Sequence, residues 1–106
     1  MKKDEVILHI DTTGIREARV RLMVHGKQYS KDVASEKLRS QAVLPIIEEL
    51  LILAGVSLTA LTDITVATGP GSFTGLRVGL SIANMLATLL DIPINGNRTL
   101  ATPEYS

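Results

Sequence analysis

Residues 67–79 read ATGPGSFTGLRVG, and this stretch decides how the rest of the chain is interpreted. The residues that lead into it, 64–67, are mostly β-branched and predict a buried strand. Gly69 and Gly71 permit a sharp turn because glycine adopts a positive φ without steric cost. An apolar segment follows, Phe73–Leu90, which is long enough for several helical turns. The stretch therefore predicts a strand, a tight turn and a long helix.

Three strands are predicted upstream of this stretch. Val6–Ile10 is a nearly continuous apolar run, typical of a strand buried on both faces. Ala18–Val24 alternates apolar with charged residues and predicts a strand with one wet face. His25-Gly26 then predicts a tight hairpin turn, with Gly26 at positive φ, into a polar returning strand at 28–33. The chain therefore opens with an antiparallel meander.

A helix and a last strand complete the pattern. Apolar residues recur at helical spacing from Glu36 to Ala54, and Gly55 is placed to end that helix. Pro45 either begins a shorter helix or bends a longer one. Ile92–Ile94 predicts a short closing strand. A meander followed by helix, strand, helix and strand predicts an α/β fold: a mixed five-stranded sheet with helices packed on it, as one domain over residues 1–106.

Composition excludes several classes of function. The 106 residues are 45% hydrophobic, enough for a core, and they include no cysteine, which excludes disulfides and thiolate metal sites. Net charge is zero and only three residues are aromatic, which argues against direct contact with nucleic acid through phosphates or stacked bases. No stretch reaches the ~20 apolar residues of a membrane span, so we expect a soluble, cytoplasmic protein with no membrane contact.

The long helix carries an unusual stripe. Small residues recur every four positions, and Arg77 is the only charged residue between Phe73 and Leu90. A surface helix of a small monomer should have a polar face, so we expect part of this helix to meet a partner, with close approach at the small residues. The alternative is that this helix and the preceding one bury each other. The predicted interface comprises Gly75, Leu76, Gly79, Leu80, Ile82, Ala83, Met85 and Ala87.

The pattern GPGSFTGLRxG after a buried strand resembles the hallmark of the TsaB (YeaZ) family. Ile10-Asp11-Thr12-Thr13, Leu44-Pro45 and Asp91–Ile94 resemble flanking motifs of that family in order and spacing. The resemblance runs along nearly all of this chain but covers only the first half of a typical member, so we expect residues 1–106 to form the family's first domain without its second. The matching residues 99–101 also lack the glutamate of the family's Ser-Leu-Glu segment.

This resemblance implies a fold and a partner. The fold would be a single ribonuclease H-like core of the actin, Hsp70 and sugar-kinase superfamily. The function would be that of a non-catalytic subunit, which binds a TsaD-like catalytic subunit through its helix layer and supports threonylcarbamoyladenosine modification of tRNA. The family also pairs with itself through this layer, so we expect a homodimer in the absence of that subunit. A stand-alone homodimer without a catalytic partner is an alternative function.

A nucleotide or phosphate site is the alternative function, as in a fragment of an actin-like ATPase or kinase. Its residues would be Asp11, Thr12, Thr13, Gly71 and Ser72, because a glycine-rich loop at a helix N-terminus can bind an anion. The loop has no lysine where a Walker motif needs one, and Asp11-Thr12-Thr13 is equally a turn former. His9 and His25 have no partner at metal-ligand spacing. We therefore expect no metal, no cofactor and no catalytic residue.

Overall fold

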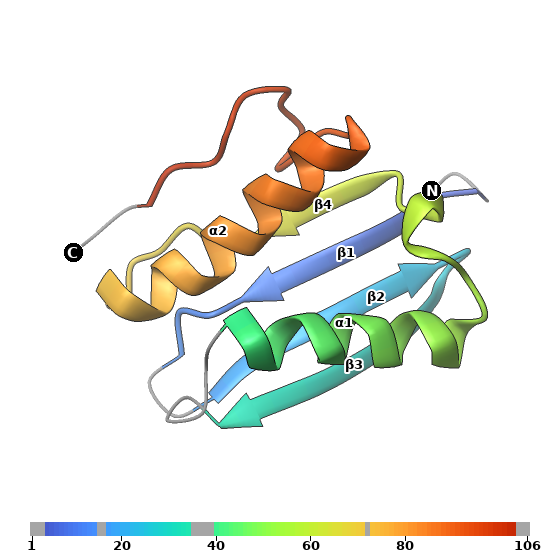
Figure 1. Ribbon diagram of the computed structural model, residues 1–106, viewed down its shortest axis with the longest axis horizontal. Coiled ribbons are helices and arrows are strands. Elements are labelled where there is room, and N and C mark those ends of the chain that lie inside the picture. Colours follow the sequence, from blue (N-terminus) through green and yellow to red (C-terminus); the bar gives the residue numbers. More distant parts are fainter. Residues whose placement is uncertain (1–3, 15–16, 35–39, 72, 104–106) are drawn as a thin grey trace.

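The computed structural model describes residues 4–14, 17–34, 40–71 and 73–103. Four strands form one sheet in the order β3-β2-β1-β4, with β1 antiparallel to β2, β2 antiparallel to β3, and β1 parallel to β4 (Figure 1). In chain order the elements are β1 (Val6–Asp11), β2 (Glu17–Val24), β3 (Lys27–Ala34), α1 (Ser40–Ala54), the 3-10 turn η2 (Leu58–Ala60), β4 (Asp63–Val66) and α2 (Phe73–Leu90).

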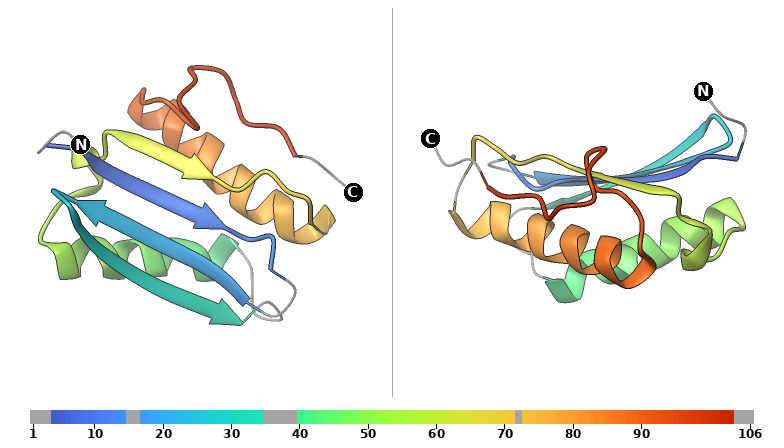
Figure 2. Two further views of the ribbon diagram at one scale, coloured as in Figure 1. Left: turned by 180° about the vertical axis from the view of Figure 1, so that it is seen from behind. Right: turned by 90° about the horizontal axis from the view of Figure 1, so that it is seen from above.

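Both helices lie on the same face of the sheet (Figure 2, right). α1 packs over β2 and β3, and α2 packs over β4 and β1. Leu8, Ile10, Leu22 and Ile64 are fully buried beneath them. Burying the four side chains stabilises the fold by roughly 1.5–3 kcal/mol each before chain entropy is counted.

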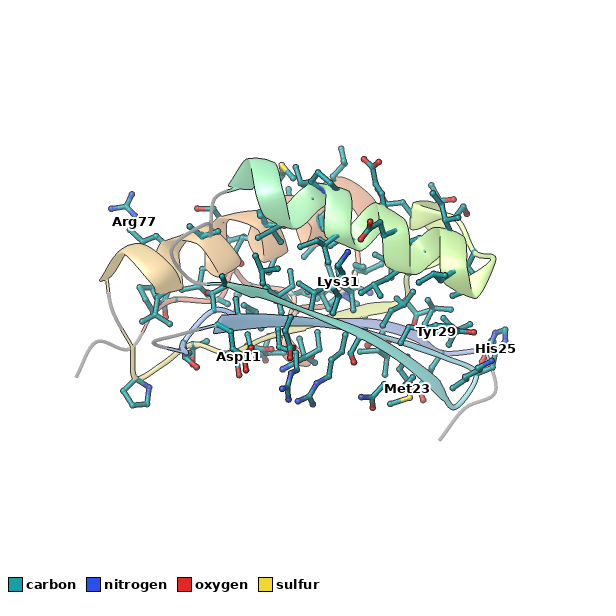
Figure 3. The ribbon with its side chains drawn as sticks, turned by 90° about the horizontal axis from the view of Figure 1, so that it is seen from below. Asp11, Met23, His25, Tyr29, Lys31 and Arg77 are labelled. Carbon is teal, nitrogen blue, oxygen red and sulfur yellow. The ribbon has the colours of Figure 1, made fainter. Side chains whose placement is uncertain are left out.

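Neither of the described helices lies on the opposite face of the sheet (Figure 2), and this corrects one prediction. β1 was expected to be buried on both faces, but its burial alternates: Leu8 and Ile10 are buried while Ile7 and His9 are half-buried. The side chains on the open face point away from the helices (Figure 3). The apolar run of β1 reflects its position between two strands rather than cover on both sides.

The predicted turns are confirmed. His25 and Gly26 have φ of 51° and 87°, which is the two-residue turn with positive φ at both positions that suits a right-twisted hairpin. Gly55 has φ of 71°, and the N–H groups of Gly55 and Val56 bond the carbonyls of Ile52 and Leu51. This pattern is a Schellman motif, in which glycine tolerates the left-handed position that ends α1.

Helix α1 resolves the two readings of Pro45. The described helix already begins at Ser40, so Pro45 lies inside it and points to solvent. Residues 36–39 of the predicted helix lie outside the described residues. The exposed Pro45 displaces no core residue, and it leaves α1 without one backbone donor.

The predicted fifth strand is reduced to a single bridge. Ile94 pairs with Ile64 of β4, and the backbone then turns back at Asn95 and Gly96, whose φ values are 51° and 78°. The Asn95 side chain takes the place that a longer strand would fill: its Oδ1 accepts from Val66 N at 2.8 Å and its Nδ2 donates to Val66 O at 3.0 Å. The described residues therefore form a four-stranded sheet, not a five-stranded one, with the β4 edge closed by this amide.

Candidate functional site

The predicted interface lies mostly inside the protein. Six of its eight residues are buried within this chain: Leu76, Gly79, Leu80, Ile82, Ala83 and Ala87. Gly75 is partly exposed, and Met85 is 47% exposed. These six residues are covered by this chain itself, because α2 turns that side toward its own sheet, and contact with another molecule through them stays a prediction.

Gly79 shows why the small residues recur. A Cβ built on Gly79 would stand 2.5 Å from Thr12 Oγ1 and 3.3 Å from Ile10 Cγ2. Both atoms belong to β1 and the residue that follows it, so the element that approaches α2 closely is the sheet. A stripe of small residues permits another element to approach closely. Here the element that approaches α2 belongs to the same chain, at Ile10 and Thr12.

The exposed face of α2 is the complement of that stripe. It comprises Arg77, Ser81, Met85, Thr88 and Leu89, at spacings that place them on one side of a helix. Leu89 is 71% exposed, and with Met85 it forms an apolar pair four residues apart. We call this set the α2 outer face. The sequence-based prediction missed Leu89. The charge of Arg77 indicated which side of the helix is exposed, and steps of four residues from Arg77 lead to Ser81, Met85 and Leu89 on that side.

Asp11, Thr12 and Thr13 come together as a turn at the end of β1. Asp11 Oδ1 accepts two hydrogen bonds from Thr13, one from its backbone N at 3.0 Å and one from its hydroxyl at 2.6 Å. Burial disfavours the charged carboxylate and is the largest single influence, but the two Thr13 bonds and the nearby His9 and Arg21 charges outweigh it and lower the pKa of Asp11. The carboxylate therefore holds the turn, as the structural alternative expected.

Gly71 lies beside this turn, since a Cβ on Gly71 would meet Thr13 Cα at 3.4 Å. Thr12 is 2% exposed, and within the described residues its Oγ1 has no hydrogen-bond partner. Ser72, the remaining residue of the predicted phosphate site, lies outside the described residues. The structure thus places Asp11, Thr13 and Gly71 together, with a turn as their visible role.

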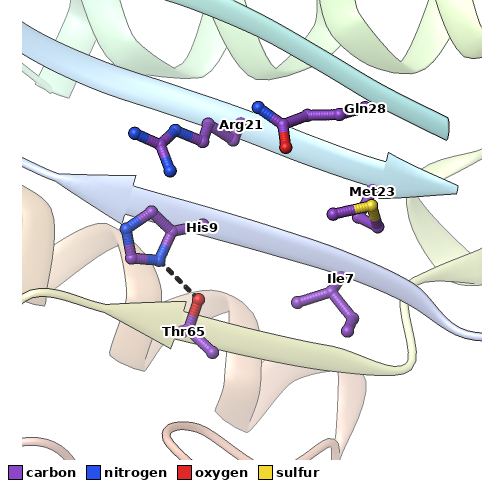
Figure 4. A pocket seen from close by; sticks show the side chains of 6 residues that line it. All are labelled: Ile7, His9, Arg21, Met23, Gln28 and Thr65. Carbon is purple, nitrogen blue, oxygen red and sulfur yellow. Dashed lines mark hydrogen bonds between the residues drawn. The ribbon is translucent and has the colours of Figure 1, made fainter. Parts of the chain in front are cut away.

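A shallow pocket of about 220 Å³ lies on the open face of the sheet (Figure 4). His9 and Thr65 share a 2.6 Å hydrogen bond across β1 and β4, beside Arg21 of β2, and Ile7 and Met23 also line the pocket (Figure 4). Burial first, and then the Arg21 charge, lower the pKa of His9, against a smaller raising effect of Asp11. A neutral His9 is therefore favoured, and the hydrogen bond to Thr65 ties the two parallel strands together.

Within the described residues no group of three His, Asp or Glu side chains could hold a metal ion. Over the same ranges no helix is long and apolar enough to cross a membrane. The α2 outer face exposes two large apolar side chains, Met85 and Leu89, which makes it a candidate contact surface.

Comparison with known proteins gives the family. The profile of the family described as "TsaD: tRNA N6-adenosine threonylcarbamoyltransferase" matches residues 32–102. The chain is 41% identical over 63 residues to the tRNA threonylcarbamoyladenosine biosynthesis protein TsaB of Escherichia coli, covering 59% of this chain and 27% of that protein. It is 35% identical over 97 residues to TsaB of Buchnera aphidicola from Schizaphis graminum, covering 92% of this chain and 46% of that protein.

Solved structures agree. YeaZ from Pseudomonas aeruginosa superposes with a TM-score of 0.79 at 33% identity, over 85% of this chain and 42% of that chain.

A transferase is also similar in sequence. The tRNA N6-adenosine threonylcarbamoyltransferase of Geotalea uraniireducens is 43% identical over 65 residues, which are 61% of this chain and 19% of that protein. The chain thus spans about half or less of the length of the relatives that it matches. Because the family profile covers well over half of the chain and TsaB proteins recur among its relatives, the chain belongs to the TsaD/TsaB (YeaZ) family.

Proposed function

We propose that this chain is a non-catalytic subunit that binds a TsaD-like catalytic protein and supports threonylcarbamoyladenosine modification of tRNA. Two TsaB relatives carry that pathway in their names, and a matched transferase is of the TsaD kind. The mixed sheet with its helices fits a single ribonuclease H-like core of the actin-like superfamily. A protein with this role would work in the cytoplasm, and direct contact with tRNA is not part of the proposal.

The observation that carries the proposal is the α2 outer face. Met85 and Leu89 expose apolar side chains on a helix that is otherwise well packed. The resemblance to the TsaB family implies that partners dock on this helix layer. The contact surface is therefore assigned to Met85 and Leu89, with Ser81 and Arg77 beside them, in place of the buried stripe that the sequence favoured.

Calorimetric titration of the chain with the TsaD-like protein of its own organism tests the surface. Met85→Glu should weaken binding by about tenfold or more, since burial of a methionine side chain is worth roughly 1.5–3 kcal/mol and a charge there would be desolvated. Thr59→Glu is the matched control, because Thr59 is exposed on η2, outside the α2 outer face, and receives the same charge. Equal affinities for the two variants would reject the α2 outer face as the contact surface.

Nucleotide binding, the alternative function, has less support. The Asp11 carboxylate already accepts two bonds from Thr13 and so acts as a turn former. Calorimetry with ATP and magnesium tests it directly. Micromolar binding that is lost in Asp11→Ala would favour nucleotide binding over the partner role.

A further inference from the structure

The pocket on the open face of the sheet has a polar end and an apolar end. Figure 4 shows the side chains of His9 and Arg21 together at one end, and those of Ile7 and Met23 together at the other. The strand pairing produces this division, because His9 lies opposite Arg21, and Ile7 lies opposite Met23, across β1 and β2. Side chains of directly opposed residues on one face of a sheet are close neighbours. The pocket is therefore amphipathic along the direction of β1.

Arg21 brings a positive charge to the polar end. Of the side chains that line the pocket, it is the one that always carries a full charge. Among the described residues no carboxylate forms an ion pair with Arg21, since Asp32 pairs with Arg19 at 2.7 Å instead. The Asp11 carboxylate, on the same face of β1, accepts its hydrogen bonds from Thr13. Arg21 is half-buried, so an anion that pairs with it would be partly shielded from water, and the pocket favours an acid as its ligand.

His9 supplies a second donor beside Arg21. Its Nδ1 shares the 2.6 Å hydrogen bond with Thr65 Oγ1. When the Thr65 hydroxyl donates this bond, the proton of the neutral ring lies on Nε2, which can donate to a ligand oxygen. A guanidinium and an imidazole N–H side by side match the two oxygens of a carboxylate, because charge-assisted hydrogen bonds of this kind are short and strong.

We propose that this pocket binds a small aliphatic carboxylic acid, with its carboxylate between Arg21 and His9 and its alkyl chain at the apolar end. The volume of about 220 Å³ lies below the roughly 300–1,000 Å³ of pockets for drug-sized ligands, so the acid has a short chain. Amines and neutral polar molecules lack the charge that Arg21 selects. The site is separate from the α2 outer face and does not rest on the proposed function.

Titration of the unmodified chain with isovalerate, followed by methyl NMR, tests the site. The chain contains three methionines, of which Met23 lines the pocket and Met85 lies on α2, away from it. The Met23 methyl signal should shift with saturation, at a dissociation constant of about a millimolar, as suits so small a ligand. The Met85 signal should not move. Isovaleramide, which has the same shape and no charge, should bind about fivefold more weakly or worse.

Two variants that each remove one positive charge give a matched comparison. Arg21→Gln should weaken the binding of isovalerate by about fivefold or more, because a charge-assisted hydrogen bond is replaced by a neutral one. Lys27→Gln removes the same charge from β3 outside the pocket, and this variant should bind isovalerate like the unmodified chain. The Met85 methyl signal of each variant reports whether the helix layer is still folded.

The same titrations can overturn the proposal. A Met23 signal that does not saturate, or that responds equally to isovaleramide, would show that the pocket does not recognise a carboxylate. Equal weakening by Arg21→Gln and Lys27→Gln would show that the general charge of the surface attracts the acid. Tighter binding of N-acetylglutamate α-amide than of isovalerate would assign the pocket to a glutamate side chain of a protein segment and reject a free acid as its ligand.

Discussion

Replacing Gly79 by alanine separates internal packing from a partner surface. The added Cβ would stand 2.5 Å from Thr12 Oγ1 and 3.1 Å from Thr12 Cγ2, whereas an ordinary contact needs at least 3.4 Å. The backbone of α2 and the end of β1 must therefore move apart by about 0.9 Å. Thr12 is 2% exposed and so has little room to move away, which leaves the helix to shift.

Two effects of opposite sign act on stability. Alanine favours a helix over glycine by about 0.5–1 kcal/mol. An added methyl group in a packed interior costs about 1–3 kcal/mol. We expect the steric clash to outweigh the gain in helix propensity, so that the free energy of unfolding falls by about 1–2 kcal/mol. For a domain of this size such a loss lowers the melting temperature by roughly 5–15 °C.

Thermal and urea unfolding followed by circular dichroism provide the assay, and a double variant provides the control. Thr12→Ala removes the two closest atoms, so adding it to Gly79→Ala should recover about 1 kcal/mol relative to the sum of the single changes. An unchanged or raised melting temperature in Gly79→Ala would refute this reasoning. If binding of the TsaD-like protein fell while stability held, Gly79 would face the partner after all.

Two further predictions concern single side chains. Because the pKa of His9 is lowered in the folded state, the unfolded chain takes up a proton first as the pH falls through about 6.5. Stability supplied by His9 is therefore full above that pH and is lost below it, and urea unfolding of His9→Gln should show a shallower decline between pH 7.5 and pH 5. Asn95→Ala should cost about 1–3 kcal/mol and speed hydrogen exchange at Val66, since both backbone groups of Val66 lose a partner. Asn97→Ala, which removes one exposed bond to Asn95 O, should have a much smaller effect, and equal losses would argue against edge closure by Asn95.

Local sequence patterns were enough for the strands and turns of the first half. Alternation in β2 and the His25-Gly26 pair correctly predicted a hairpin, since both depend on neighbours along the chain. Gly55 likewise ended α1 as its position indicated. The signal missed was Asn95-Gly96, a pair that favours a two-residue turn with positive φ at both positions. This pair forms the turn directly after the predicted strand Ile92–Ile94, and the Asn95 side chain bonds Val66 where a longer strand would pair.

The site was harder to predict because a stripe of small residues does not say what approaches it. Gly79 is small so that Thr12 and Ile10 can lie against α2, and only the packed structure distinguishes this from a partner helix. Arg77 gave the better clue, since it lies on the side of α2 that is exposed. The sequence also could not predict that one face of the sheet is uncovered, because an apolar run such as that of β1 fits a strand covered on one face or on both.

The role of this chain as a partner-binding subunit is tested most directly by the solution mass of the chain mixed with the TsaD-like protein of its own organism. Light scattering coupled to size-exclusion chromatography should show one species that contains both proteins and that Met85→Glu disrupts more than Thr59→Glu does. Elution of the two proteins as separate species, each with its own mass, would contradict the account and leave the family membership as a statement about fold.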